Sequence, residues 1–189
     1  MELVQQLRHE AIARGLNVPD QPGPADVFSL VRELPYRRAS DRRPETTIRE
    51  WRGTCSGKHY LLRALLAELG IESDLIAAPC YVAVDPAQLP APLAAILAEG
   101  PVPDVHNYLR LPWIVDATWP LATAAYGVPV NPEWREGQDM LLPCSPQQEF
   151  TVPEGASEQA FKDRLLSEHF TAEELERRDR FFAELAGTG

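Results

Sequence analysis

One stretch of the chain combines a dense helical repeat of leucines with a cysteine near its start. Residues 53–60 read Gly-Thr-Cys-Ser-Gly-Lys-His-Tyr, and a leucine-rich run follows and ends at Gly70. The leucines stand at positions 61, 62, 65, 66 and 69, the spacing of one buried helical face. Gly70 is typical of a helix end, and Thr54 is a candidate N-cap whose hydroxyl would accept from the amide of Ser56 or Gly57. The pattern predicts a helix that begins at Cys55.

Helical periodicity also occurs towards both ends of the chain. Residues 3–12 predict a short amphipathic helix ending near Gly15, and residues 27–34 predict a second helix stopped by Pro35. The connection from 36 to 47 is polar and Arg-rich, so we expect it to be exposed. Residues 85–99 predict a short helical insertion. Two further helices are expected at the end of the chain, the first capped by Ser157 and the second by a capping box at residues 171–174.

Strand-forming residues lie between these helices. Residues 74–78 and 80–84 read as strands broken by Pro79, and residues 105–110 and 113–118 predict an antiparallel hairpin. This hairpin would bring His106 close to Asp116, because cross-strand neighbours have Cβ atoms roughly 4.5–5.5 Å apart. Residues 119–155 are Pro-rich and predict loop with one strand at 150–152. Helices together with an antiparallel sheet predict an α+β fold.

Length, composition and charge limit the number of domains and the kinds of partner to be expected. A chain of 189 residues, of which 44% are hydrophobic and 24% charged, is expected to form a single domain with a full core. We expect that domain to span 1–189, with a core at about 24–155 and a C-terminal helical extension at 156–189. The formal net charge is −10, which argues against nucleic-acid and anionic-membrane partners.

Cysteine usage indicates a reducing compartment. The chain contains three cysteines, at positions 55, 80 and 144, and an odd count without paired spacing argues against a disulfide framework. Cys80 is expected in a strand and Cys144 in a loop. The N-terminal residues have no apolar segment of a secretion signal, so we expect a cytoplasmic protein.

Cys55 is a candidate nucleophile. The free N–H groups and dipole at a helix N-terminus favour an anion, and they lower a thiol pKa from its ordinary value of about 8.5. Lys58 and His59 share the helical face of Cys55, so this face is expected to open onto a cleft. We therefore take Lys58, His59, Trp51 and Trp119 as candidate substrate-binding or oxyanion-stabilising residues. The alternative is that Cys55 is a small buried apolar residue.

The motifs resemble those of the transglutaminase-like superfamily of papain-fold cysteine enzymes. Members of this family have a Gly-x-Cys step that opens a Leu-rich helix ending in Leu-Gly-Ile, here residues 53–55 and 69–71. They also have a His-Ala-Trp-like strand, here residues 106–108, followed by a Trp-x-x-Asp-x-Thr-like strand, here residues 113–118. The chain is similar to a divergent, stand-alone, bacterial-type member of the family.

The resemblance implies a papain-like fold with the nucleophile helix packed on an antiparallel sheet. It also implies a triad in which Cys55 attacks a carbonyl, His106 shuttles the proton and Asp116 orients His106. The implied substrate is a peptide, a protein or a small amide or thioester, and the acyl acceptor is water or an amine. No calcium-loop pattern is present, so we expect no cofactor and no metal.

The departures from the family pattern keep other functions open. Asn107 and Tyr108 replace the usual Ala-Trp, and Lys58-His59 stands where aromatic and small residues are more common. A catalytically silent protein-interaction module is therefore the alternative to an enzyme. A zinc site formed by Cys55, His59 and His106 is disfavoured because the three lack a compact ligand pair.

Overall fold

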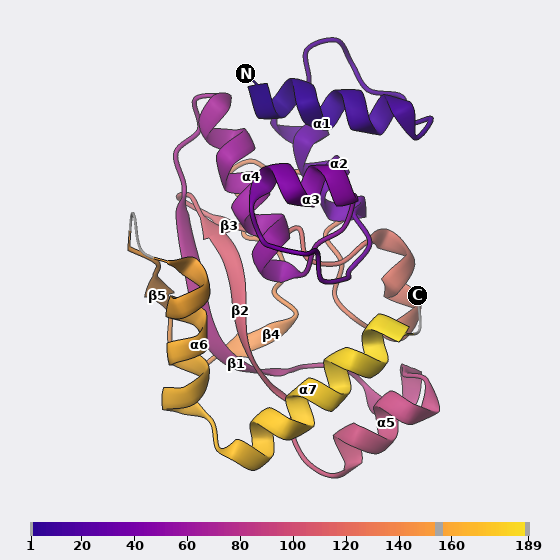
Figure 1. The fold of residues 1–189 in the computed structure, drawn as a ribbon, viewed down its shortest axis with the longest axis vertical. Coiled ribbons are helices and arrows are strands. Elements are labelled where there is room, and N and C mark those ends of the chain that lie inside the picture. Colours follow the sequence, from indigo (N-terminus) through magenta and orange to yellow (C-terminus); the bar gives the residue numbers. More distant parts are fainter. Residues whose placement is uncertain (1, 154–156, 188–189) are drawn as a thin grey trace.

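The computed structural model describes residues 2–153 and 157–187. The chain has an α+β fold, as predicted, with helices packed around an antiparallel sheet (Figure 1). Helices α1 (Glu2–Ala13), α2 (Pro24–Glu33) and α3 (Pro44–Glu50) lie together at one end of the molecule. Helices α5 (Ala91–Ala98) and α7 (Ala172–Gly187) lie at the opposite end.

The sheet is built around a long central strand. Strand β1 (Asp74–Val82) pairs with β2 (Pro103–Arg110) on one side and with the short strands β4 (Cys144–Pro146) and β5 (Phe150–Thr151) on the other. Strand β3 (Ile114–Val115) then extends the sheet beyond β2. Within the described residues every strand pair is antiparallel.

Pro79 does not break β1, contrary to the prediction. Its carbonyl accepts from the amide of Gln147 at 3.0 Å, on the side of β4 and β5. Because the N–H and C=O of one strand residue point to the same side, the missing N–H of Pro79 also faces that side. No paired residue of β4 or β5 lies opposite Pro79, which is therefore tolerated in a central strand.

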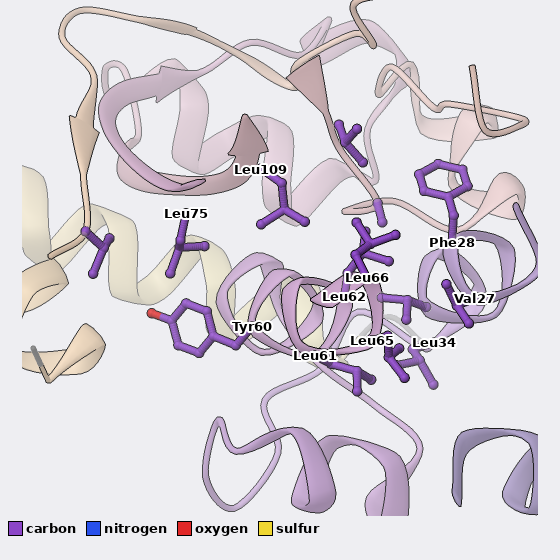
Figure 2. Packing of buried hydrophobic residues seen from close by; sticks show 14 of the residues in the cluster. Val27, Phe28, Leu34, Tyr60, Leu61, Leu62, Leu65, Leu66, Leu75 and Leu109 are labelled. Atoms are coloured by element: carbon purple, nitrogen blue, oxygen red, sulfur yellow. The ribbon is translucent and has the colours of Figure 1, made fainter. Parts of the chain in front are cut away.

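The core surrounds helix α4 (Cys55–Glu68), which begins at Cys55 as the sequence predicts. Figure 2 shows the α4 leucines between side chains of α2 and of the sheet. Four of these leucines are fully buried: Leu61, Leu62, Leu65 and Leu66. The helix ends where expected, because Gly70 adopts a left-handed conformation with φ of +80°.

Three elements are absent from the sequence prediction. Helix α3 occupies part of the connection expected to be exposed, and its Thr46, Thr47 and Ile48 are buried. A 3₁₀ helix, η2 (Leu121–Tyr126), and strand β4 interrupt the expected loop at 119–155. Cys144 therefore lies in a strand and not in a loop. These elements depend on packing and pairing with distant segments, which local periodicity does not encode.

The remaining predicted elements are present. The insertion after β1 contains η1 (Pro86–Gln88) and α5, and both C-terminal caps form. Helix α6 (Glu158–His169) begins after Ser157, whose side chain accepts from Ala160, and Thr171 and Glu174 exchange the bonds of a capping box before α7. Helix α6 packs on β1 and β2, and α7 packs on β2 and α5.

Candidate active site

Cys55 occupies the first position of α4, where helical N–H groups have no partner within the helix. Thr54 is the N-cap in extended conformation, as predicted, but its side chain makes no capping hydrogen bond. The start of the helix is packed closely against α3. A Cβ atom at Gly53 would lie 3.3 Å from the Thr47 methyl group and 3.2 Å from the Lys58 side chain. Because glycine has no Cβ atom, α3 and the start of α4 can lie this close together, and this packing fixes the position of the Cys55 thiol.

His106 and Asp116 form a buried hydrogen-bonded pair. The distance from His106 Nε2 to Asp116 Oδ2 is 2.6 Å, which confirms the predicted proximity. The register pairs Leu109 with Val115, so Asp116 lies just past β3 and diagonal to His106 instead of directly opposite. The other carboxylate oxygen, Oδ1, accepts from the amide of Thr118 at 2.9 Å. The carboxylate is thus held on both sides.

His106 and Cys55 also interact, because each is among the groups that shift the pKa of the other. Burial by itself would lower the pKa of His106, but Asp116 and Cys55 outweigh burial and raise that pKa well above its ordinary value. Burial would raise the pKa of Cys55, but the Lys162 ammonium and His106 outweigh it and lower that pKa to about 6. Both shifts favour a thiolate beside an imidazolium, which is the charge state that a cysteine nucleophile requires.

Lys162 of α6 is a residue of the site that sequence analysis missed. Its ammonium lies 3.7 Å from Cys55 Sγ and 3.4 Å from Asp104 Oδ1, and its side chain is buried. Asp104 in turn accepts from two nitrogens of Arg178 on α7, at 3.0 and 2.8 Å. The C-terminal helices α6 and α7 therefore supply cations to the site.

Lys58 and His59 have structural contacts, and neither lines the cavity described below. The Lys58 ammonium donates to the carbonyls of Arg32 and Thr118, each at 2.8 Å, and burial lowers its pKa to about 7. His59 Nδ1 donates to the Cys55 carbonyl at 2.8 Å, while Nε2 accepts from the amide of Ala117 at 3.0 Å. Burial lowers the pKa of His59 to about 4, so the ring is neutral and joins the nucleophile helix to the segment that carries Asp116.

The departure at Asn107 also has a structural role. Ser56, next to the nucleophile, donates to Asn107 Oδ1 at 2.8 Å, and Asn107 Nδ2 donates to the Ile76 carbonyl at 3.1 Å. All three residues are buried. Asn107 therefore joins the first turn of α4 to β2 and β1, and it fixes the thiol relative to His106.

A cavity of about 590 Å³ lies beside His106. Its wall includes His106, Tyr36, Trp51 and Trp119, so two of the four predicted binding residues line it. Burial and the nearby Cys55 raise the pKa of Tyr36 well above its ordinary value, which keeps the phenol protonated. The ring of Tyr36 stacks against that of Trp119, with centroids 4.3 Å apart.

The residues missed by sequence analysis carry weak local signals. Tyr36 follows Pro35 in a segment that reads as exposed loop, and Lys162 stands on an ordinary polar helix.

Among residues 2–153 and 157–187 no group of three or more acidic, histidine or cysteine side chains is arranged to hold a metal ion. Within the same residues no helix has both the length and the apolar character needed to span a membrane. Searches of protein-family models, curated proteins and solved structures found no match to this chain.

Proposed function

We propose that the protein is a cysteine-dependent acyl-transfer enzyme of transglutaminase-like, papain-fold type. The observation that carries the proposal is the grouping of Cys55, His106 and Asp116. The thiol lies at the N-terminus of a buried helix, His106 lowers the pKa of this thiol, and Nε2 of His106 lies 2.6 Å from a buried carboxylate. The packing of α4 on an antiparallel sheet further supports this fold type.

The reaction begins with attack of the Cys55 thiolate on the carbonyl carbon of an amide or thioester. A carbon–sulfur bond forms, and the tetrahedral intermediate collapses with loss of the leaving group, which takes the proton of His106. The neutral imidazole then removes a proton from water or an amine. Attack of this acceptor breaks the bond to Cys55 and releases a carboxylic acid or a new amide. Asp116 keeps His106 in one tautomer and orientation throughout.

The first turn of α4 supplies the site for the developing oxyanion. The backbone N–H of Cys55 has no partner within the helix and projects outward from its N-terminal end, where it can donate to an oxygen on the reacting carbon. The positive end of the helix dipole adds to this stabilisation.

Substrate entry requires a local movement. Cys55 is only 2% exposed, and two residues that interact with it, Tyr36 and His106, form part of the cavity wall. Tyr36 belongs to the segment between α2 and α3, outside the regular elements. A shift of this side chain connects the thiol to the cavity without disturbing the His106–Asp116 pair.

The first test is the pH dependence of alkylation by iodoacetamide in the wild type and in His106→Ala, with peptide mapping to quantify each cysteine. Cys80 and Cys144 serve as internal references. Alkylation of Cys55 that stays fast well below pH 8, and that is lost in the variant, is expected for the thiolate–imidazolium pair. An ordinary thiol profile that the variant leaves unchanged would contradict the enzyme and favour an interaction module.

The acceptor is tested separately. Intact-mass analysis of a substrate incubated with and without added amine distinguishes the two reactions. Formation of a new amide identifies a transferase, whereas hydrolysis that the amine leaves unaffected identifies a hydrolase.

A further inference from the structure

The cavity next to the triad has a definite chemical character. Most of its wall is apolar, and this wall combines segments that are distant in sequence. Phe181, Phe182 and Leu185 come from α7, Val82 comes from the end of β1, and Val128 and Pro143 come from the segment that follows η2. His106 and Tyr36, which both influence the thiol of Cys55, belong to the same wall, so the cavity lies next to the thiol and is separated from it by the Tyr36 side chain.

The apolar wall is preformed. Phe181 is buried in a cluster with Leu93 and Val102, so α7 is packed on the insertion that carries α5. Arg178, one turn before Phe182, is bonded to Asp104 on β2 and lies over the ring of Phe182. A cavity of about 590 Å³ is within the range of sites that bind small molecules, which is roughly 300–1,000 Å³.

We propose that this cavity is the acyl-binding pocket and that the preferred donor is a thioester or amide of an uncharged, aliphatic acyl group of medium length. This inference rests on the proposed acyl transfer at Cys55. The carbonyl carbon lies at the thiol, and the alkyl chain extends along the apolar wall towards α7. Burial of each added methylene favours longer chains until the cavity is filled. The wall also includes Glu50, Arg52 and Asp104, but the aromatic and aliphatic side chains of α7 would remove the hydration of a charge at the end of the acyl chain, which is therefore disfavoured.

The test uses N-acetylcysteamine thioesters of the acetyl, butyryl, hexanoyl, octanoyl and decanoyl groups. Formation of the acyl-enzyme is followed by intact-mass spectrometry, with Cys55→Ala as the control for the site of acylation. The rate constant is expected to rise about fourfold for each added methylene up to a plateau, which corresponds to the ordinary gain from burying that group. Equal rates for the acetyl and octanoyl donors would overturn the acyl pocket while leaving the acyl-transfer reaction intact.

A matched pair of variants locates the pocket. Ala122 and Ala124 are both exposed on η2, but only Ala122 lines the cavity. Ala122→Trp places an indole in the cavity, and it should lower the ratio of octanoyl to acetyl rates by about tenfold or more, as expected for overfilling. Ala124→Trp should leave this ratio unchanged. Identical ratios in the two variants would place the acyl chain elsewhere.

The pocket can be tested even if no donor acylates the protein. In Cys55→Ala, binding of octanamide and of acetamide is measured by isothermal titration calorimetry. If octanamide binds to Cys55→Ala more tightly than acetamide does, and the double variant Cys55→Ala/Ala122→Trp loses this difference, the pocket is supported even though no acylation occurs. Failure of octanamide to bind more tightly than acetamide would overturn the pocket itself.

Discussion

Replacement of Lys162 by methionine gives the sharpest test of the charge arrangement at the thiol. The variant removes the ammonium that lies 3.7 Å from Cys55 Sγ but keeps an unbranched side chain of similar length. Two unit charges at this distance interact by about 1 kcal/mol in water and about 4 to 5 kcal/mol at an effective dielectric constant of about 20. Since one pH unit corresponds to about 1.4 kcal/mol, the pKa of Cys55 should rise by roughly 1 to 3 pH units.

The assay is the rate of Cys55 alkylation by iodoacetamide between pH 5 and 10. The wild-type midpoint is expected at about 6, and the Lys162→Met midpoint at roughly 7 to 9. Lys162→Arg keeps the positive charge and should stay near the wild type. A methionine variant that is folded and retains the wild-type midpoint would refute the assignment, because the low pKa would then depend on His106 and the helix terminus alone.

Three further changes test other parts of the structure. Asp116→Asn should slow acylation of Cys55 roughly 100- to 10,000-fold, measured with the thioester donors, since His106 loses the group that orients it; a wild-type rate would remove Asp116 from the triad. His59 has a folded-state pKa of about 4, below its ordinary value of about 6.5, so the unfolded chain takes up the proton first and stability falls as pH drops through this window. Urea unfolding should show a loss of about 3 kcal/mol between pH 6.5 and 4 that is absent in His59→Gln, and parallel curves for the two proteins would contradict the neutral buried imidazole. Leu65→Ala should lower the free energy of unfolding by about 2 to 5 kcal/mol, whereas Leu141→Ala, at a side chain that is 61% exposed, should change it by less than about 0.5 kcal/mol; equal effects would place the core elsewhere.

Sequence reasoning succeeded where the determinants are local. The leucine repeat of α4 is complete within about four helical turns, and Thr54 and Gly70 mark its ends. The approach of His106 to Asp116 was predictable because the two residues are ten positions apart across a tight hairpin. The register was less predictable, because β3 is only two residues long and Asp116 lies beyond it.

Sequence reasoning failed where the determinants are distant. Lys162 approaches Cys55 across 107 positions, and nothing in a polar helix distinguishes a lysine that will be buried. Lys58 and His59 were placed correctly on the face of Cys55, but that face packs against the carbonyls and amides of other segments instead of opening onto the cavity. Helical spacing identifies which residues share a face, but it does not identify what the face contacts.

The charges of the site, all buried except the partly exposed Arg178, form one alternating series. In order of contact it contains three anions and three cations: Asp116, His106, Cys55, Lys162, Asp104 and Arg178. Burying any one of these charges alone would be strongly unfavourable, whereas a neutral series in which every charge contacts its opposite is tolerated. The thiolate is therefore stabilised by α6 and α7 as well as by its own helix.

This neutrality has a consequence for the proposed reaction. Acylation removes the negative charge of Cys55, and in the same step His106 gives its proton to the leaving group and becomes neutral. The remaining charges are Asp116 and Asp104 against Lys162 and Arg178, so the net charge of the series is zero before and after acylation. A buried site that kept His106 protonated in the acyl-enzyme would hold an uncompensated positive charge, which burial disfavours. The same burial that makes the site difficult to reach thus favours the neutral imidazole, the form that activates water or an amine in the second half of the reaction.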